Sequence, residues 1–181
     1  MGEVTLRVHG GEARGRRLTT PPGIRPTKGM VVEAIFNLLG ERVLDAEVVD
    51  LCAGSGALGI EALSRGAEQA IFVERNPTTA VVIDQNLERL GYAKRGQVIQ
   101  SEACRWLAGD GGSSEAARLW LVDPPYNQPV LAGILGRLDE LVGAGIVVVE
   151  HAAEQLLPAL THLQVIKQRR YGDSRVTVLE K

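Results

Sequence analysis

The chain has 181 residues, of which 45% are hydrophobic and 23% are charged, a composition typical of a globular domain large enough to bury a core. No apolar run reaches the roughly 18 residues that a membrane-spanning helix needs, and the N-terminus lacks the regions of a signal peptide. The two cysteines, Cys52 and Cys104, have no metal-ligand spacing. We therefore expect a reduced, cytoplasmic protein without structural disulfides.

The formal net charge of −2 conceals an uneven distribution along the chain. Residues 1–28 carry six Lys or Arg against two Asp or Glu, a net +4, and residues 161–181 carry five against two, a net +3. Residues 29–160 carry nine against eighteen, a net −9. Basic ends on an acidic core indicate ends that face a polyanion, with a solvated basic tail as the alternative interpretation.

The first 26 residues predict a hairpin. Two short β-like stretches, from Thr5 to His9 and from Arg17 to Thr20, flank a glycine- and arginine-rich turn. This segment offers few apolar side chains for packing. We interpret residues 1–26 as a basic β-hairpin extension that contacts RNA, and residues 27–181 as the main domain.

After Thr27 the apolar period becomes helical, and strands and helices then alternate. The first helix presents one apolar face made of Val32, Ile35, Phe36 and Leu39. Five buried strands are expected, at 47–51, 69–74, 96–100, 119–122 and 145–150. Helices are expected at 57–65, after the N-cap pair Asn76-Pro77, and from Val130 to Leu141. Two last strands, at about 163–170 and 175–179, predict an antiparallel hairpin.

This order of elements predicts an α/β fold. Five β-α steps followed by a hairpin indicate an open, mostly parallel, seven-stranded sheet with helices on both faces. In such sheets ligands bind beyond the carboxyl ends of the strands. The residues that follow each strand are therefore the candidates for a functional site.

A glycine-rich turn follows the first strand and comprises Ala53, Gly54, Ser55 and Gly56. Its glycines permit a tight turn and let a ligand approach backbone that has no Cβ atom. The pattern Gly54-x-Gly56-x-x-Gly59 also matches the dinucleotide-binding fingerprint. Asp50 favours a cationic, amino-acid-like ligand instead, because its carboxylate would repel a pyrophosphate.

Carboxylates also follow the next two strands. Glu74 ends the second strand, where it can accept hydrogen bonds from both ribose hydroxyls of a nucleotide or nucleoside cofactor. Glu102 follows the third strand and can accept a hydrogen bond from an adenine amino group. Its alternative interpretation is an exposed residue in the first turn of a helix.

The fourth strand ends in the most specific motif of the chain, Asp123-Pro124-Pro125-Tyr126. The two prolines remove two N–H donors and leave a rigid turn lined by the Asp123 carboxylate and the Pro124 carbonyl. Hydrogen bonds from an exocyclic amine to these acceptors favour a pyramidal nitrogen whose lone pair faces a methyl donor. Tyr126 can stack on the base. The motif therefore indicates methylation of an amino nitrogen on a nucleic-acid base.

Taken together, these strand-end residues resemble the amino-methylating class I methyltransferases. The outer segments resemble the bacterial RsmD family, which methylates guanine N2 in 16S ribosomal RNA, at residues 11–18, 25–27, 33–37, 58–67 and 171–174. The resemblance covers essentially the whole chain. It implies a Rossmann-like fold, S-adenosylmethionine as the cofactor, and 16S rRNA within a small-subunit ribosomal particle as the partner. In one departure, Met30 and Val32 stand where the family usually carries arginines.

The motifs and the resemblance assign a role to each candidate residue. Catalysis is assigned to Asp123, Pro124, Pro125 and Tyr126. Cofactor binding is assigned to Asp50, Ala53, Gly54, Ser55, Gly56, Glu74 and Glu102. The cationic residues expected to hold RNA phosphates are Arg7, Arg14, Arg16, Arg17, Arg25 and Lys28. No metal, no membrane and no obligate protein partner is expected.

Other functions stay open at this stage. A nicotinamide oxidoreductase would share the glycine turn and Glu74, but it has no use for the motif that begins at Asp123. A non-catalytic RNA-binding or ribosome-assembly protein would need only the basic ends. Among methyltransferases, adenine N6 in DNA or another RNA base is an alternative target.

Overall fold

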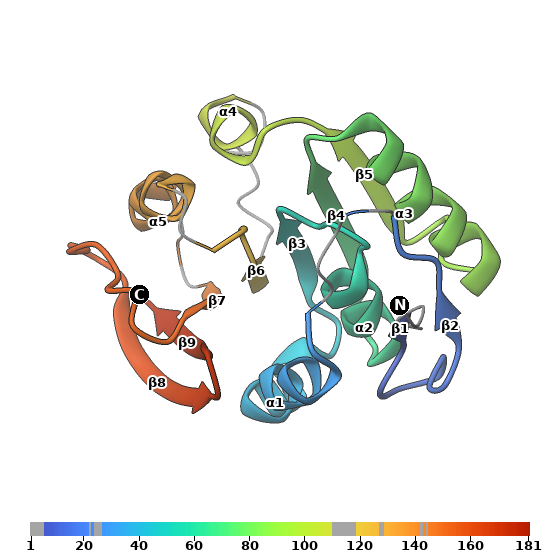
Figure 1. Ribbon diagram of the computed structural model, residues 1–181, viewed down its shortest axis with the longest axis horizontal. Coiled ribbons are helices and arrows are strands. Elements are labelled where there is room, and N and C mark those ends of the chain that lie inside the picture. Colours follow the sequence, from blue (N-terminus) through green and yellow to red (C-terminus); the bar gives the residue numbers. More distant parts are fainter. Residues whose placement is uncertain are drawn as a thin grey trace.

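The computed structural model describes residues 6–21, 23, 27–109, 119–126, 129–141, 143 and 145–181. The strands are β1 (Leu6–Arg7), β2 (Arg17–Leu18), β3 (Glu47–Leu51), β4 (Gln69–Glu74), β5 (Gly96–Gln100), β6 (Leu119–Val122), β7 (Ile146–Ala152), β8 (Gln164–Tyr171) and β9 (Ser174–Glu180) (Figure 1). The helices are α1 (Gly29–Leu39), the 3-10 helix η1 (Gly40–Val43), α2 (Ala57–Ser64), α3 (Pro77–Leu90), α4 (Ala103–Ala108) and α5 (Val130–Leu141). Within these ranges, none of the helices has the length and apolar character that a bilayer crossing requires.

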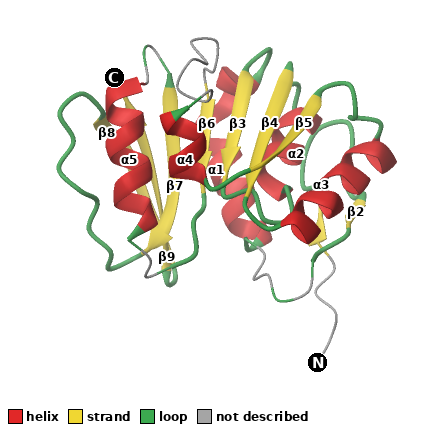
Figure 2. Ribbon diagram, turned by 90° about the horizontal axis from the view of Figure 1, so that it is seen from above, coloured by secondary structure: helices red, strands yellow, loops and turns green. Residues whose placement is uncertain are grey.

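The main sheet has seven strands in the order β5-β4-β3-β6-β7-β9-β8. The first five of these pair in parallel, and β9 runs antiparallel to both β7 and β8. Helices α1, α2 and α3 cover one face, and α4 and α5 cover the other (Figure 2). The α/β fold predicted from the sequence is confirmed. The order reverses between β3 and β6, which is where an open sheet of this kind holds its ligand.

Four of the strand predictions match the observed bounds, and the fifth strand is longer than predicted. β7 ends at Ala152 because its antiparallel pairing with β9 continues to the pair Ala152–Ser174. That pairing partner lies more than twenty positions away along the chain, so local sequence does not reveal it.

Helix α3 shows how local sequence sets the helix ends. The Asn76 side chain accepts hydrogen bonds from the backbone N–H groups of Thr78 and Thr79 at 2.9 and 3.2 Å, and Pro77 follows as the first helical residue. Gly91 ends the helix in a left-handed conformation with φ of 82°. These contacts place Asn76 at the carboxyl end of β4, where the ligand is expected.

The N-terminal hairpin packs into the core, which corrects the expectation that it has few apolar side chains to contribute. Its buried apolar residues are Leu6, Val8, Ala13 and Leu18. The Ser64 hydroxyl at the end of α2 accepts a hydrogen bond from the Ala13 N–H at 2.9 Å and donates to the Gly10 carbonyl at 2.6 Å. Asn86 of α3 accepts from the Thr19 N–H at 2.9 Å and donates to the Thr19 carbonyl at 3.0 Å. Helices α2 and α3 therefore hold the hairpin in place.

Candidate active site

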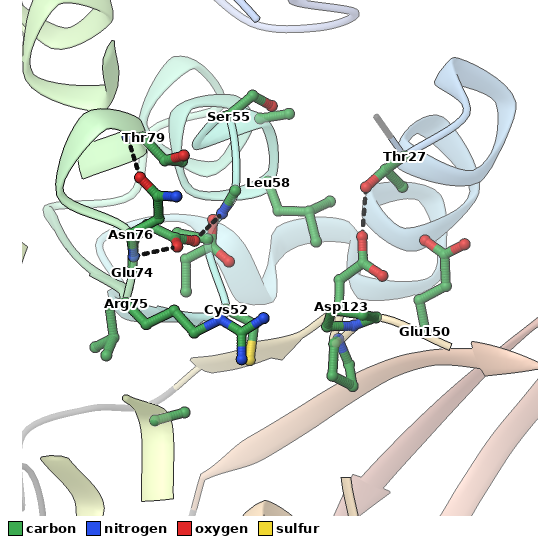
Figure 3. Close-up of a pocket in the computed structure, with 18 of the residues that line it drawn as sticks. Thr27, Cys52, Ser55, Leu58, Glu74, Arg75, Asn76, Thr79, Asp123 and Glu150 are labelled. Atoms are coloured by element: carbon green, nitrogen blue, oxygen red, sulfur yellow. Dashed lines mark hydrogen bonds between the residues drawn. The ribbon is translucent and has the colours of Figure 1, made fainter. Parts of the chain in front are cut away.

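A cavity of about 600 Å³ lies at the carboxyl ends of the parallel strands, a volume within the usual range for small-molecule sites. The sequence-predicted residues that line it are Lys28, Asp50, Ala53, Gly54, Ser55, Glu74, Glu102, Asp123, Pro124, Pro125 and Tyr126. Figure 3 shows Glu74 and Asn76 on one side of this cavity and Asp123 and Glu150 on the other. The cavity thus joins the residues predicted for cofactor binding to those predicted for catalysis.

The glycine-rich turn has a left-handed backbone at several positions. Cys52, Gly54 and Gly56 have φ values of 63°, 55° and 76°. Gly56 does not line the cavity; it precedes α2, and a Cβ atom there would lie only 3.1 Å from the Ile83 side chain. The turn therefore depends on glycine both for its conformation and for its packing on α3.

Glu74 is tied to the two turns on either side of it. Its Oε2 accepts a hydrogen bond from the Gly54 N–H at 2.9 Å, and its Oε1 accepts one from the Asn76 N–H at 2.8 Å. Each carboxylate oxygen has two lone pairs, so both keep capacity to accept from ligand hydroxyls. Glu74 is therefore placed to shape the cavity and also to bind a ligand in it.

Asp50 lines the cavity and is 1% exposed. Its Oδ2 accepts a hydrogen bond from the Gly59 N–H in the first turn of α2 at 2.9 Å. Burial raises the pKa of Asp50 well above its usual value, and the negative charges of Asp123 and Glu74 raise it further, against the lowering effect of the Gly59 bond. A site with this excess of carboxylates favours a ligand that carries positive charge.

Glu102 lines the cavity and is also the N-cap residue of α4. Its Oε1 accepts from the Cys104 N–H at 3.1 Å and its Oε2 from the Arg105 N–H at 2.9 Å, so it caps the N-terminus of α4. This geometry agrees with the alternative interpretation as a helix-start residue. Contact with an adenine amino group stays a prediction.

The turn after β6 is held by a residue that precedes α1. Thr27 donates a hydrogen bond from its Oγ1 to Oδ2 of Asp123 at 2.5 Å (Figure 3). Pro124 is buried and Pro125 is exposed. Thr27 was not predicted as a site residue, because 96 positions separate it from Asp123 and no local pattern connects the two.

Tyr126 is held through its hydroxyl by two buried side chains. The hydroxyl donates to Oε1 of Glu150 at 2.8 Å and lies 2.6 Å from Oγ of Ser174, where either oxygen can donate. Burial raises the pKa of Tyr126 to about 12, with the Glu150 charge adding to it and the Ser174 bond opposing it. Glu150 follows the same strand-end rule that singled out Glu74, so the sequence carried a signal for it.

The basic residues of the N-terminus separate into two groups. Lys28 lines the cavity, whereas Arg16 and Arg17 lie at the far end of α3, where an Arg16 guanidinium N–H donates to the Arg89 carbonyl at 2.9 Å. The Arg89 guanidinium in turn donates to the Arg17 carbonyl at 2.6 Å. Arg7 and Arg14 are exposed on the same hairpin, and Arg25 lies outside the described residues.

Known proteins resemble this chain over nearly its full length. A family model described as Conserved hypothetical protein 95 matches residues 6–180. Ribosomal RNA small subunit methyltransferase D of Escherichia coli K12 is 36% identical over 164 residues, which cover 88% of this chain and 81% of that protein. YlbH of Bacillus subtilis, a candidate rRNA methyltransferase, is 37% identical over 182 residues, which cover 97% of this chain and 99% of that protein. The solved structure of a hypothetical protein from Thermus thermophilus has a TM-score of 0.84 at 30% identity, with 97% and 99% coverage.

Proposed function

Because this chain belongs to the RsmD family, to which the matched family model corresponds, we propose that it methylates the exocyclic N2 amine of a guanine in 16S ribosomal RNA. The methyl donor is S-adenosylmethionine. The observation that supports the proposal is one cavity lined both by Glu74, to which we assign the cofactor, and by Asp123, to which we assign the target amine.

The residues of the cavity fit this methyl donor. The carboxyl groups of Asp50 and Glu74 complement a sulfonium and an ammonium group. They lie close together, since burial and then the neighbouring charges of Asp123 and Glu74 raise the pKa of Asp50. Glu74 can accept hydrogen bonds from two ribose hydroxyls. The glycine turn allows close approach of the ligand to the backbone. When bound, the cofactor supplies a methyl group on a positively charged sulfur.

The protein itself contributes by position and by polarisation. Thr27 holds the Asp123 carboxylate, which accepts a hydrogen bond from the guanine N2 amine together with the Pro124 carbonyl. These bonds localise the nitrogen lone pair and aim it along the line of methyl transfer. Tyr126, anchored by Glu150 and Ser174, stacks on the base, which has left its own stack in the RNA.

The RNA contact of the basic N-terminal residues belongs to the same proposal. Lys28 is at the cavity and would meet the target nucleotide. Arg16 and Arg17 would meet RNA farther away, because they contact Arg89, which stands 13 residues beyond Asn76, or about 20 Å along the axis of α3. A structured substrate, such as a small-subunit particle, would span this distance.

Mass mapping of modified nucleosides tests the proposal. 16S rRNA from cells that lack the gene should lose one N2-methylguanosine, and the purified chain with S-adenosylmethionine should restore it. Restoration of a methylated adenosine, or methylation of DNA in place of RNA, would assign the cavity to another target base.

A further inference from the structure

The C-terminal hairpin presents a basic surface at the edge of the sheet. β8 is the last strand of the seven, and seven of its eight residues are exposed. Three of these carry positive charge, and a fourth cation follows the turn into β9. We call this set the C-terminal basic strip: Lys167, Arg169, Arg170 and Arg175.

Strand register places this strip beside the cavity. Glu150, which lines the cavity, pairs with Val176 on β9, and Val176 pairs with Arg169 on β8. Directly paired residues point to the same face, so Arg169 shares the face of Glu150. Two inter-strand steps of about 4.8 Å put their Cα atoms roughly 10 Å apart.

The turn of the same hairpin reaches the cavity itself. Tyr171 and Ser174 form the last pair of β8 and β9, and Ser174 lines the cavity and contacts the Tyr126 hydroxyl. Arg170 and Arg175 are the next pair, one residue farther along each strand, and their side chains leave the sheet edge on the face opposite to that of Arg169. An RNA strand whose base enters the cavity would therefore pass close to these guanidinium groups.

The cations of the strip are available for binding. Among the described residues, Arg170 forms an ion pair with the exposed Glu154 at 2.8 Å, whereas Lys167, Arg169 and the half-buried Arg175 form none. The Arg169 and Arg170 guanidinium groups each donate one hydrogen bond to a backbone carbonyl at 3.0 Å, which leaves their other N–H groups for a ligand. Exposed guanidinium groups bind phosphate oxygens in bidentate geometry. The charge and the position of the strip favour a polyanion that continues beyond the cavity.

We propose that the C-terminal basic strip binds the phosphate backbone of the RNA strand on either side of the target nucleotide. The inference rests on the proposed function, since it takes RNA as the substrate of the cavity. It assigns the near RNA contact to β8 and β9, whose cations lie close to Glu150 and Ser174. Arg16 and Arg17, by contrast, lie at the far end of α3, about 20 Å along its axis from Asn76.

The test compares two variants that each remove three positive charges. One is Lys167→Ala/Arg169→Ala/Arg175→Ala in the strip. The matched control is Arg42→Ala/Lys94→Ala/Arg137→Ala, which removes exposed cations that do not line the cavity. Affinity for a 16S rRNA fragment is measured as a function of salt concentration, and affinity for S-adenosylmethionine is measured by calorimetry.

The strip variant should bind the fragment about tenfold to a hundredfold more weakly, with a salt slope reduced by roughly two to three, because each phosphate contact contributes about 0.7–0.9 to that slope. The control should change the affinity less than threefold, and both variants should bind the cofactor as the wild type does. Equal RNA affinity and slope in the two variants would overturn the inference. Equally tight binding of polyglutamate by the wild type would assign the strip to acidic proteins and would also overturn it.

Methylation of the same fragment separates this inference from the proposed function. A wild type that forms N2-methylguanosine, together with a strip variant of unchanged RNA affinity, rejects the strip alone. A wild type that binds the cofactor but methylates no RNA rejects the proposed function and the strip with it.

Discussion

The N-terminal and C-terminal hairpins are both short antiparallel pairs with an excess of basic residues, yet they relate to the core differently. In the N-terminal hairpin, Leu6 pairs with Leu18 and both side chains are 5% exposed. In the C-terminal hairpin, Val165 and Ile166 of β8 are 54% and 40% exposed, although β9 is buried. The net charge of a hairpin therefore does not indicate which of its side chains are exposed. Their exposure depends on whether helices pack against the hairpin.

The two regions also share a feature. A hydroxyl group in or next to each hairpin contacts the turn from Asp123 to Tyr126: Thr27, just after the N-terminal hairpin, donates to Asp123, and Ser174, the first residue of β9, bonds Tyr126. The first hydroxyl acts on a carboxylate and the second on a neutral phenol. Loss of the Thr27 hydroxyl should therefore reduce activity more than loss of the Ser174 hydroxyl, because hydrogen bonds to charged groups are stronger.

The largest effect that separates the hairpins should be on stability. Leu18→Ala removes a buried side chain and should lower the free energy of unfolding by about 2–5 kcal/mol. Val165→Ala on β8 should change it by no more than about 0.5 kcal/mol, since that side chain is largely exposed. Urea unfolding of both variants provides the measurement. Equal, small effects would show that the N-terminal hairpin is an appendage after all.

A smaller effect is expected at Thr27. Thr27→Val removes the hydroxyl that holds Asp123 and should lower the turnover number by roughly tenfold to a hundredfold, equivalent to about 1.5–3 kcal/mol. Thr27→Ser keeps the hydroxyl and is the matched control. Turnover that falls equally in both variants would mean that the methyl group of Thr27, and not its hydrogen bond, matters.

The effect at Ser174 should be smaller again. Ser174→Ala should lower kcat/KM for RNA by about twofold to tenfold, or roughly 0.5–1.5 kcal/mol, with cofactor affinity unchanged. If Ser174 acts through the Tyr126 hydroxyl, then Ser174→Ala should have no further effect in a Tyr126→Phe background. A double-mutant cycle with additive losses would contradict this positioning role.

The smallest effect is expected for the hairpin arginines on a short substrate. Arg14→Ala/Arg16→Ala/Arg17→Ala should weaken binding of an RNA stem-loop that carries only the target site by less than about threefold, and binding of longer RNA by more. Filter binding against RNAs of increasing length measures this. If the arginine variant lost as much affinity for the stem-loop as the strip variant does, the two hairpins would contribute equally to binding near the target site, which would contradict this prediction.

Sequence reasoning was most successful where the cause of a structure is local. The buried run from Glu47 to Leu51 and the caps Asn76 and Gly91 are set by neighbouring residues, and the structure reproduces them. The strand-end rule also placed Asp123 and Glu74 at one cavity, because the carboxyl ends of parallel strands share an edge.

The sequence did not reveal contacts between distant segments. Asp123 depends on Thr27, 96 positions earlier, and Tyr126 depends on Ser174, 48 positions later. The sequence predicts a surface extension for the N-terminal hairpin because residues 1–28 have a net charge of +4 and few apolar residues. The hairpin's partners on α2 and α3, Ser64 and Asn86, are identified only when the chain is folded.

The central claim, that the turn beginning at Asp123 acts on the target amine and not on the cofactor, is tested most directly by Asp123→Ala. Calorimetry with S-adenosylmethionine and single-turnover methylation of 16S rRNA are measured on the same preparation, with Glu74→Ala as the comparison. Asp123→Ala should abolish methyl transfer and leave cofactor affinity within about twofold, whereas Glu74→Ala should weaken cofactor binding by roughly 1–3 kcal/mol. Near-normal methyl transfer by Asp123→Ala would contradict the account.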